Sequence, residues 1–279
     1  MGTHLLLIDP QNDFCDLPAE WLPRSPMSGE VIRPALPVAG AHADMHRVTQ
    51  LTVRLRSRLH AITVTLDSHH RIDIAHPGFW REGSGSHPAP FTPITADQVR
   101  GGVFTPRDPD MRSRALAYLD ALEATGRYTL MVWPVHCQMG SWGHDVHAGL
   151  QAALDTWADA QGRSVAIVTK GENPWTEHYS ALQAEVPDAS DARTELNQSL
   201  LQELDRFDRV LIAGEAGSHC VRATVEHLAE HLPSKKLGKL VLLTDCISPV
   251  AGFEARQADF FAAMKAKGLQ LALSTEIQA

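Results

Sequence analysis

Short apolar runs alternate with longer stretches of helical spacing along most of the chain. The runs are rich in Val, Ile and Leu and read as nearly continuous hydrophobic segments, which is typical of strands that are buried on both faces. We therefore predict strands at 4–8, 61–66, 128–133, 164–169, 209–213 and 239–243, with a weaker pattern at 269–274.

Amphipathic stretches lie between these strands, and they predict helices. The apolar positions Met111, Ala115, Leu119 and Leu122, for example, recur at roughly helical intervals. Regular alternation of strands and helices predicts an α/β fold with three layers, in which helices cover both faces of a mostly parallel, doubly wound sheet. The predicted helices are at 41–58, 111–124, 144–159, 195–206, 219–231 and 253–267.

Two segments break this alternation. Residues 14–38 contain five prolines, and residues 77–109 contain many Gly, Pro and Ser residues, so we predict a long loop in each. Residues 1–279 are otherwise predicted to form a single domain, with a long loop insertion at about 77–127. Loops of this length in a compact domain commonly form lids or interfaces, so we expect the insertion to be part of a lid or of a subunit interface.

Composition excludes several classes of protein. The formal net charge is −8 and no basic patch is evident, which argues against a nucleic-acid partner. No apolar run approaches the roughly 18 residues of a membrane span, and the N-terminus lacks the basic start of a signal peptide. The four cysteines include no CxxC pair, so no disulfide scaffold is expected. We expect a soluble, cytoplasmic protein that acts on a small molecule.

Chemically capable residues follow five of the predicted strands. In an open parallel sheet, ligands bind at the carboxyl ends of the strands, so residues placed there are candidates for a shared site. Because five strands would deliver such residues to the same edge of the sheet, we predict that they form one active site. The residues are Asp9, Asp67, His136 with Cys137, Lys170 and Cys220.

Cys220 is the best candidate for a nucleophile. Ser218 is expected to be the N-cap of the helix at 219–231, which would place Cys220 in the first turn, where the helix dipole favours a thiolate. A buried structural cysteine is the alternative interpretation, and we adopt it for Cys15, Cys137 and Cys246.

Asp9 and Lys170 are the expected partners of this cysteine. A carboxylate beside a lysine can accept the thiol proton and return it to a leaving group. Taken singly, Asp9 has the ordinary interpretation of a turn or cap residue, and Lys170 that of a solvated lysine at a strand end. Their joint placement favours a catalytic role.

Asp67, His69 and His136 form a set of one carboxylate and two imidazoles. Such sets bind Zn, Fe or Mn and leave coordination positions open for substrate or water. We therefore predict one divalent metal ion, with zinc as the first choice. Whether His76 is a further ligand stays open at this point.

The order of these motifs resembles the nicotinamidase/pyrazinamidase branch of the isochorismatase-like cysteine hydrolases. The resemblance runs from residue 5 to about residue 250, interrupted by the insertion. The motifs that carry it are IDPQNDF (8–14), LDSHH (66–70), WPVHC (133–137), TKGENP (169–174) and GEAGSHCVRAT (214–224).

The resemblance implies hydrolysis of nicotinamide to nicotinate and ammonia through a cysteine thioester, as in NAD salvage, and a homo-oligomer. It also implies that the metal binds the ring nitrogen of the substrate. The site residues that it implies are the triad Asp9, Lys170 and Cys220; the metal ligands Asp67, His69 and His136; the pocket walls Phe14 and Trp133; Gln11 near the metal; a cis peptide between Glu215 and Ala216; and an oxyanion hole from the N–H groups of Ala216 and Cys220.

The chain also departs from the family pattern. The family usually has A-T-D-x-C before the nucleophile, whereas this chain has Ala-Gly-Ser-His-Cys at 216–220, and His76 follows Asp67 at a longer interval than usual. The alternatives are therefore another amide or carbamoyl substrate, or a vinyl ether of the isochorismate type, for which the metal set would not be needed. A catalytically inert binding protein and a redox-sensing thiol protein, in which Cys137 would resolve Cys220, are alternatives of other classes.

Overall fold

The computed structural model describes residues 2–278, and its centre is a sheet of six parallel strands. The strands lie in the order β10-β9-β8-β1-β2-β7, and every neighbouring pair is parallel. The predicted mostly parallel, doubly wound sheet is thus confirmed. The strands are β1 (Thr3–Ile8), β2 (Leu59–Asp67), β7 (Ala166–Lys170), β8 (Arg209–Gly214), β9 (Leu240–Leu243) and β10 (Gln270–Ala272).

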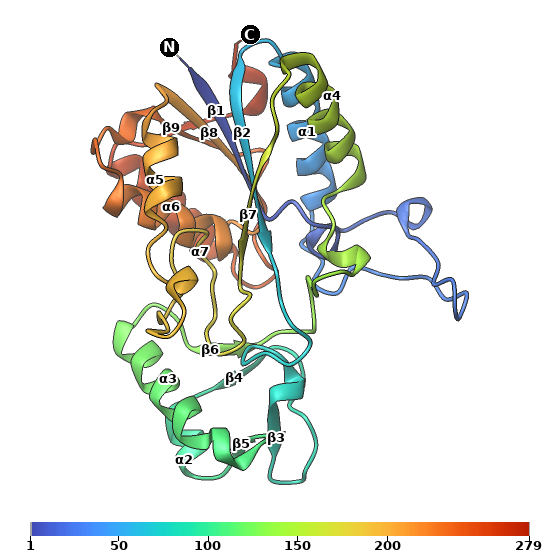
Figure 1. Cartoon of the computed structure of the whole chain (residues 1–279), viewed down its shortest axis with the longest axis vertical. Helices are drawn as coiled ribbons and strands as arrows, with labels where there is room; N and C mark the ends of the chain where they lie inside the picture. Colours follow the sequence, from blue (N-terminus) through green and yellow to red (C-terminus); the bar gives the residue numbers. More distant parts are fainter. Residues whose placement is uncertain (1, 279) are drawn as a thin grey trace.

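Helices form a layer on each side of this sheet (Figure 1). One layer contains α1 (Ala41–Arg54) and α4 (Ala148–Gln161). The other contains α5 (Gln198–Asp205), α6 (Cys220–His231) and α7 (Glu254–Ala266). The predicted helices lie where expected, although α1 ends four residues earlier than predicted and α4 begins four residues later. The three-layer α/β fold is confirmed.

The core lies between these layers and is built around β1. All six residues of β1 are buried, and Leu5, Leu6, Leu7 and Ile8 have no exposed surface. Burial of both faces explains why β1 reads as an unbroken hydrophobic run. The edge strand β7 differs, because Ile167 is 53% exposed there.

The order of the strands reverses between β1 and β8, which are direct neighbours in the sheet. Such a switch point opens a crevice at the carboxyl ends of the strands. Gly214, the last residue of β8, has a φ of 124°, and a Cβ atom there would lie 2.0 Å from the carbonyl oxygen of Ile8. A glycine is therefore required where the two strands part.

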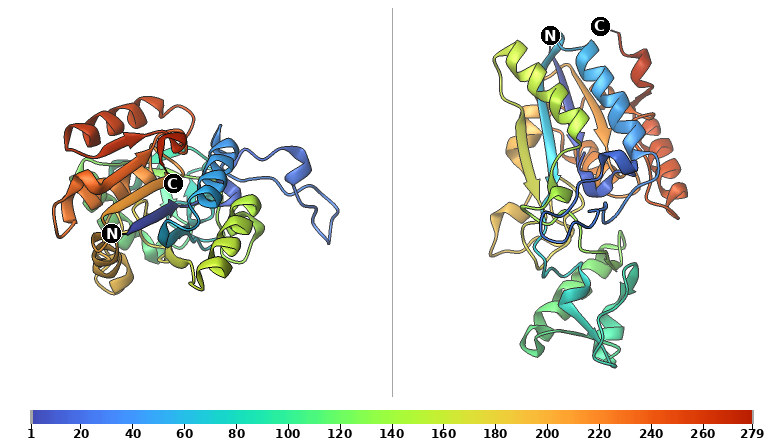
Figure 2. Two further views of the ribbon diagram at one scale, coloured as in Figure 1. Left: turned by 90° about the horizontal axis from the view of Figure 1, so that it is seen from above. Right: turned by 90° about the vertical axis from the view of Figure 1, so that its right-hand side faces the viewer.

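The long loop predicted at 77–127 is wrong, although the helix predicted at 111–124 within it is present as α3 (Arg112–Thr125). The segment contains short strands and two helices that form a separate lobe beyond the carboxyl edge of the sheet, at the bottom of Figure 1 and in the right-hand view of Figure 2. Buried apolar residues such as Trp80, Ile94 and Leu119 pack inside it. Strands of three residues are too short for a periodic pattern to reveal them. The elements are β3 (Trp80–Glu82), β4 (Thr92–Ile94), α2 (Ala96–Arg100), β5 (Phe104–Pro106) and α3 (Arg112–Thr125).

The strand predicted at 128–133 exists but is not part of the central sheet. It is β6 (Leu130–Val132), which pairs antiparallel with β4, while β3 pairs antiparallel with β5. His136 therefore comes from the end of this small ribbon rather than from a neighbouring strand of the main sheet.

The other predicted loop, 14–38, is largely irregular and includes one short 3-10 helix, Ala19–Trp21. Figure 2 shows it reaching out from the side of the molecule that carries α1 and α4. The four cysteines are all free thiols and buried. None of the helices within residues 2–278 has both the length and the apolar character that a membrane crossing requires.

Candidate active site

The ends of β1, β7 and β8 bring Asp9, Lys170 and Cys220 together. Lys170 Nζ lies 2.8 Å from Asp9 Oδ2 and 3.6 Å from Cys220 Sγ. The hydroxyl of Thr65 on β2 donates a hydrogen bond of 2.6 Å to Asp9 Oδ1. The structure thus places a carboxylate, an ammonium and a thiol in one buried cluster at the switch point of the sheet.

Burial and charge act in opposite directions on these groups. Burial raises the pKa of Asp9, and the Lys170 ammonium opposes this only in part. Burial disfavours the charged form of Lys170, but the carboxylates of Asp67 and Asp9 outweigh it and hold its pKa well above the ordinary value. Lys170 is therefore a fixed positive charge beside a carboxylate that is ready to accept a proton.

Cys220 does not favour the thiolate in this structure, contrary to the expectation from the sequence. Burial raises the pKa of the thiol well above its ordinary value, and this exceeds the opposite effect of the Lys170 ammonium. The side chain is only 6% exposed, so desolvation outweighs the helix dipole. The thiol needs a base, and Asp9 lies in the same cluster to serve as one.

The expected N-cap of this helix is also corrected. Helix α6 begins at Cys220 itself, and His219 is its N-cap residue, with no side-chain capping bond. The Ser218 hydroxyl instead lies 2.9 Å from His219 Nδ1 and accepts the N–H of Val250 at 3.0 Å. Ser218 therefore orients the His219 ring and does not cap the helix.

Asp67 links the reactive cluster to a group of histidines. Its Oδ1 lies 3.0 Å from Lys170 Nζ, and its Oδ2 lies 3.1 Å from His69 Nε2 and 3.3 Å from His136 Nε2. The predicted metal set is thus brought together around one carboxylate oxygen. Burial opposes the charge on Asp67, but His69 and Lys170 hold its pKa well below the ordinary value.

His76 lies in the same group, so the structure makes it a candidate for a further ligand. The ligand nitrogens of His69, His76 and His136 lie within 4.8 Å of one another, and all three residues are buried. Oxygen atoms lie near each Nδ1, as is common for histidines that bind metals. These contacts are Asp73 Oδ2 to His69 at 3.1 Å, the His70 carbonyl to His76 at 3.1 Å, and the Pro134 carbonyl to His136 at 2.9 Å.

The charges around these histidines fit a divalent cation. The carboxylates of Asp9, Asp67 and Asp73 are buried here, and Lys170 supplies a single buried ammonium. A divalent ion among the imidazoles would offset part of the negative charge of these carboxylates. Three imidazoles and a carboxylate are also the donor types that zinc prefers. The residues present therefore fit a bound metal ion.

A small cavity adjoins both groups. Its aromatic walls include Trp133 and Tyr179, whose hydroxyl accepts a hydrogen bond of 3.1 Å from the indole of Trp133. Apolar walls with a few convergent polar groups are typical of a site for a small ligand. The lining residues are Phe14, Leu36, Asp67, Trp133, His136, Glu177, Tyr179, Ala216, His219, Cys220 and Val250.

The structure places most of the residues implied by the resemblance at this cavity, but not all. Phe14, Trp133 and Ala216 line it, and the peptide between Glu215 and Ala216 is cis. Asp9, Gln11, His69 and Lys170 are not among its lining residues. The Gln11 amide is buried and bonds both the N–H and the carbonyl of Asp67, each at 2.8 Å, so it positions a candidate metal ligand.

Sequence reasoning missed five residues that line the cavity: the apolar Leu36 and Val250, and the polar or aromatic Glu177, Tyr179 and His219. Glu177 and Tyr179 come from the irregular segment between β7 and α5, where no periodicity exists to place them. His219 could have been found, because it directly precedes the candidate nucleophile. Burial raises the pKa of the Glu177 carboxyl to about 7.

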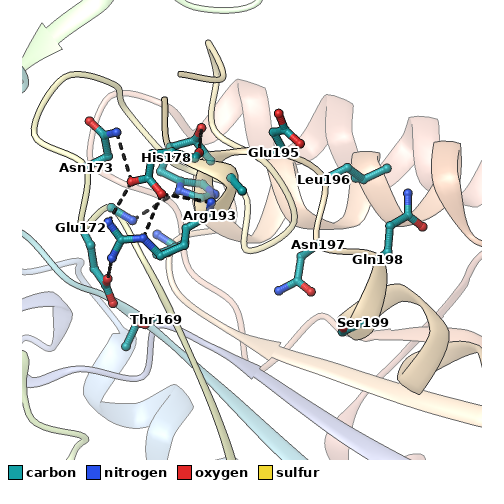
Figure 3. A pocket seen from close by; sticks show the side chains of 15 residues that line it. Thr169, Glu172, Asn173, His178, Arg193, Glu195, Leu196, Asn197, Gln198 and Ser199 are labelled. Carbon is teal, nitrogen blue, oxygen red and sulfur yellow. Dashed lines mark hydrogen bonds and ion pairs between the residues drawn. The ribbon is translucent and has the colours of Figure 1, made fainter. Parts of the chain in front are cut away.

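A second, wider cavity lies beside the segment that follows β7 (Figure 3). Cys220 and the three histidines of the metal group are not among its lining residues. Arg193 spans part of it through ion pairs with Glu172 and Asp191, and Asn173 bonds the same aspartate at 3.2 Å. These polar side chains pair with one another. Lys170 also lines this cavity, whereas the candidate nucleophile Cys220 lines the smaller one.

Solved structures with this architecture include several amide hydrolases. The yeast nicotinamidase Pnc1p bound to the inhibitor nicotinaldehyde matches with a TM-score of 0.64 and 20% identity, over 97% of this chain and 99% of that one. A nicotinamidase/pyrazinamidase of Acinetobacter matches with a TM-score of 0.63 and 17% identity, over 99% and 98%. The pyrazinamidase of Pyrococcus horikoshii in complex with zinc matches with a TM-score of 0.53 and 17% identity, over 98% and 99%.

The chain has the fold of these hydrolases. The fold implied by the resemblance is therefore confirmed over nearly the whole chain. No family model and no curated protein sequence matches the chain.

Proposed function

We propose that the protein is a nicotinamidase-like amide hydrolase, which converts nicotinamide to nicotinate and ammonia. The observation that carries this proposal is the position of Lys170 Nζ, 2.8 Å from Asp9 and 3.6 Å from the Cys220 thiol, beside a small aromatic cavity. The likeness to nicotinamidases over nearly the whole chain supports it.

The first step is attack on the carboxamide. Asp9 accepts the proton of the Cys220 thiol, and the sulfur forms a bond to the carbonyl carbon. The backbone N–H groups of Ala216 and Cys220 hold the resulting oxyanion, a contribution of roughly 3–4 kcal/mol per donor in comparable sites. Both residues line the cavity at the start of α6.

The second step releases ammonia and leaves a thioester. Asp9 returns its proton to the departing nitrogen as the carbon–nitrogen bond breaks. A water molecule then adds to the thioester carbon as Asp9 takes one of its protons. Asp9 passes this proton to the sulfur as the carbon–sulfur bond breaks, which restores the Cys220 thiol and the Asp9 carboxylate. The sum is one amide and one water converted to one acid and one ammonia.

Lys170 and the histidines prepare this chemistry. Lys170 fixes the charge state of Asp9 and of the sulfur through its ammonium. Asp67, His69, His76 and His136 would hold one divalent ion, with zinc as first choice and iron or manganese as alternatives. When bound, that ion would orient the pyridine nitrogen of the substrate.

The walls of the cavity suit a flat aromatic amide. Phe14, Trp133 and Tyr179 present rings, and the empty space is small. Hydrolysis of nicotinamide here would place the protein in NAD salvage. The predicted cytoplasmic location and homo-oligomer stay predictions.

The second candidate is hydrolysis of another small amide or carbamoyl compound. Glu177 favours it, because this carboxyl group lines the cavity and its Oε2 is bonded to no other residue within 2–278. A substrate with a hydrogen-bond donor opposite Glu177 would use that oxygen.

Ammonia release from nicotinamide tests the proposal, with Cys220→Ala as the control and metal analysis on the same preparations. We expect turnover by the wild-type protein, loss of at least about 10³-fold in Cys220→Ala, and equal metal content in both. Metal binding without nicotinamide turnover would move the search to other amides. Turnover that survives Cys220→Ala would overturn the proposed mechanism.

A further inference from the structure

A buried carboxyl group lies directly before the proposed oxyanion hole in the sequence. Glu215 immediately precedes Ala216 and has no exposed surface, yet it is not among the residues that line the catalytic cavity. Its Oε2 accepts the N–H of Ser248 at 3.1 Å. No N–H or hydroxyl group within residues 2–278 donates to its Oε1. The mechanism proposed above gives this carboxyl group no role.

A second buried carboxyl group, from helix α1, contacts Glu215. Asp44 is buried, and its carboxyl shares a side-chain hydrogen bond with that of Glu215. An ionised carboxylate only accepts hydrogen bonds, so this bond requires a proton on one of the two groups. Glu215 Oε1 is the oxygen that lacks another donor. It is therefore the atom that carries the proton and donates it to Asp44.

The surrounding charges keep this proton on Glu215. Burial and the charge of Asp245 raise the pKa of Asp44, but Arg47, whose guanidinium lies 2.8 Å from Asp44 Oδ1, opposes them. Burial raises the pKa of the Glu215 carboxyl well above its ordinary value, and the negative charges of Asp44 and Asp16 act in the same direction. Glu215 is therefore a neutral donor and Asp44 a charged acceptor.

Ser248 connects both carboxyl groups to the backbone that carries Ala216. Its hydroxyl donates a hydrogen bond of 2.5 Å to Asp44 Oδ2, and its N–H donates to Glu215 Oε2. Its carbonyl accepts the N–H of Gly217 at 2.8 Å. All three polar groups of Ser248 thus hold the segment 215–217 against α1.

We propose that Glu215 and Asp44 share one proton and, together with Ser248, position the N–H of Ala216 toward the oxyanion. This inference rests on the amide hydrolysis proposed above. Glu215 is a positioning residue, because it does not line the cavity in which the reacting atoms would lie. The oxyanion develops only on the way to the tetrahedral intermediate, so a displaced donor lowers kcat and leaves KM nearly unchanged.

The arrangement depends on the proton, and this dependence guides the choice of variants. Two ionised carboxylates in contact repel each other, so loss of the proton would separate Glu215 from Asp44. Glutamine at position 215 keeps both bonds, because its amide can donate to Asp44 while its carbonyl accepts the N–H of Ser248. Methionine at this position has a similar length and loses both bonds.

Steady-state hydrolysis of nicotinamide by the full-length protein tests the positioning role. We expect kcat of Glu215→Met to fall by about 10- to 100-fold, with KM within about threefold of the wild type, and Glu215→Gln to recover most of that kcat. Ser248→Ala loses the hydroxyl bonded to Asp44 and should show a smaller loss of kcat. Thr52→Val is the matched control, because it removes a buried hydroxyl on α1 that donates to the Val48 carbonyl, and it should keep the wild-type kcat. Circular dichroism checks the fold of each variant.

A second readout detects the proton without measuring activity. A protonated carboxyl has an infrared C=O band that a carboxylate lacks, so the difference spectrum between the wild type and Glu215→Gln at pH 8 should show this band in the wild type. Glu177 and Glu185, whose pKa values are raised by burial to about 7, are mostly ionised at that pH and are common to both proteins.

The two readouts separate this inference from the proposed function. Absence of the band would overturn the shared proton, and a wild-type kcat in folded Glu215→Met would overturn the positioning role. If the band is present but the wild-type protein does not hydrolyse nicotinamide, the shared proton is supported and the proposed function fails.

Discussion

The two ends of strand β1 carry similar buried groups with different consequences. At the amino end, His4 is 1% exposed and its Nε2 lies 2.9 Å from the hydroxyl of Thr63 on β2. At the carboxyl end, Asp9 is fully buried and accepts a hydrogen bond of 2.6 Å from the hydroxyl of Thr65 on the same strand. In each case an ionisable side chain is buried against a threonine of the neighbouring strand.

The difference lies in the charges that surround each group. Burial alone lowers the pKa of His4 to about 4, and the nearest ring is that of Phe207, at 4.8 Å between centroids. Asp9 instead meets the Lys170 ammonium from β7 and lies in one cluster with the Cys220 thiol from α6. A buried group without charged partners becomes neutral and affects stability, whereas convergent charged partners make a reactive site.

Topology explains why only one end is reactive. The strand order reverses between β1 and β8, and the loops that leave their carboxyl ends diverge and open a crevice. Side chains from β1, β2, β7 and α6 meet there.

Among the substitutions that test this comparison, Asp9→Asn should have the largest effect, which is a loss of activity. The amide has nearly the same shape and can still bond Thr65, but it cannot accept the thiol proton. We expect kcat/KM for amide hydrolysis to fall by about 10²–10⁴-fold, with the fold intact. Ammonia release measures the effect, and far-UV circular dichroism checks the fold. His4→Gln, at the other end of the strand, is the matched control and should retain wild-type activity. Equal activity of Asp9→Asn and wild type would mean that another group is the base.

His4→Gln should show the second largest effect, on stability in acid. The folded pKa of His4 is about 4 and the unfolded value is about 6.5, so the unfolded chain binds more protons between these pH values. Stability therefore falls as the pH drops from about 6.5 to about 4, and His4 contributes up to about 3 kcal/mol of that loss. The Gln variant cannot be protonated at this position, so its free energy of unfolding should fall by about 3 kcal/mol less over the same pH range.

Urea unfolding at pH 7 and pH 4.5 measures this effect. The quantity to compare is the loss of unfolding free energy between the two pH values, because the substitution also changes the packing against Phe207. An identical loss in both proteins would show that the acid sensitivity comes from other groups.

The sequence predicted the central sheet well and the lobe at 77–127 poorly, for a physical reason. Strands such as β1 are buried on both faces, so their hydrophobic runs are unmistakable. Strands such as β3 and β5 have three residues each, and their pairing depends on contacts that a local pattern does not contain. The sequence contains one signal for helix α2, the capping box between Thr95 and Gln98. That signal is hard to recognise because it lies inside a segment rich in turn residues.

The site shows the same limit. The strand ends predicted Asp9, Asp67 and Lys170, because the fold brings such positions to one edge. Glu177 and Tyr179 come from an irregular segment whose path depends on tertiary packing, so no spacing could place them at the cavity. The thiol of Cys220 shows a further limit, because its desolvation is set by the whole surrounding structure.

Among these substitutions, Asp73→Asn should have the smallest effect. It tests the difference between His69, which has carboxylate partners, and His4, which has none. Asp73 is fully buried, and its Oδ2 lies 3.1 Å from His69 Nδ1 while its Oδ1 accepts the N–H of Ala75 at 2.9 Å. Burial disfavours a charged His69, but the carboxylates of Asp67 and Asp73 outweigh it and raise its pKa well above the ordinary value. His4 has no such partners.

A carboxylate behind a metal-binding imidazole orients the ring and makes it a stronger ligand. Asp73→Asn keeps the size of the side chain but removes its charge, so we expect zinc affinity to fall by about 10–100-fold. Competition with a chromophoric chelator measures the affinity, and His4→Gln again serves as the control. Because Asp73 is absent from the set that lines the cavity, activity at saturating metal should stay close to that of the wild type. Unchanged zinc affinity in Asp73→Asn would mean that His69 does not bind the ion, and the metal would then have to be held by His76, His136 and Asp67 alone.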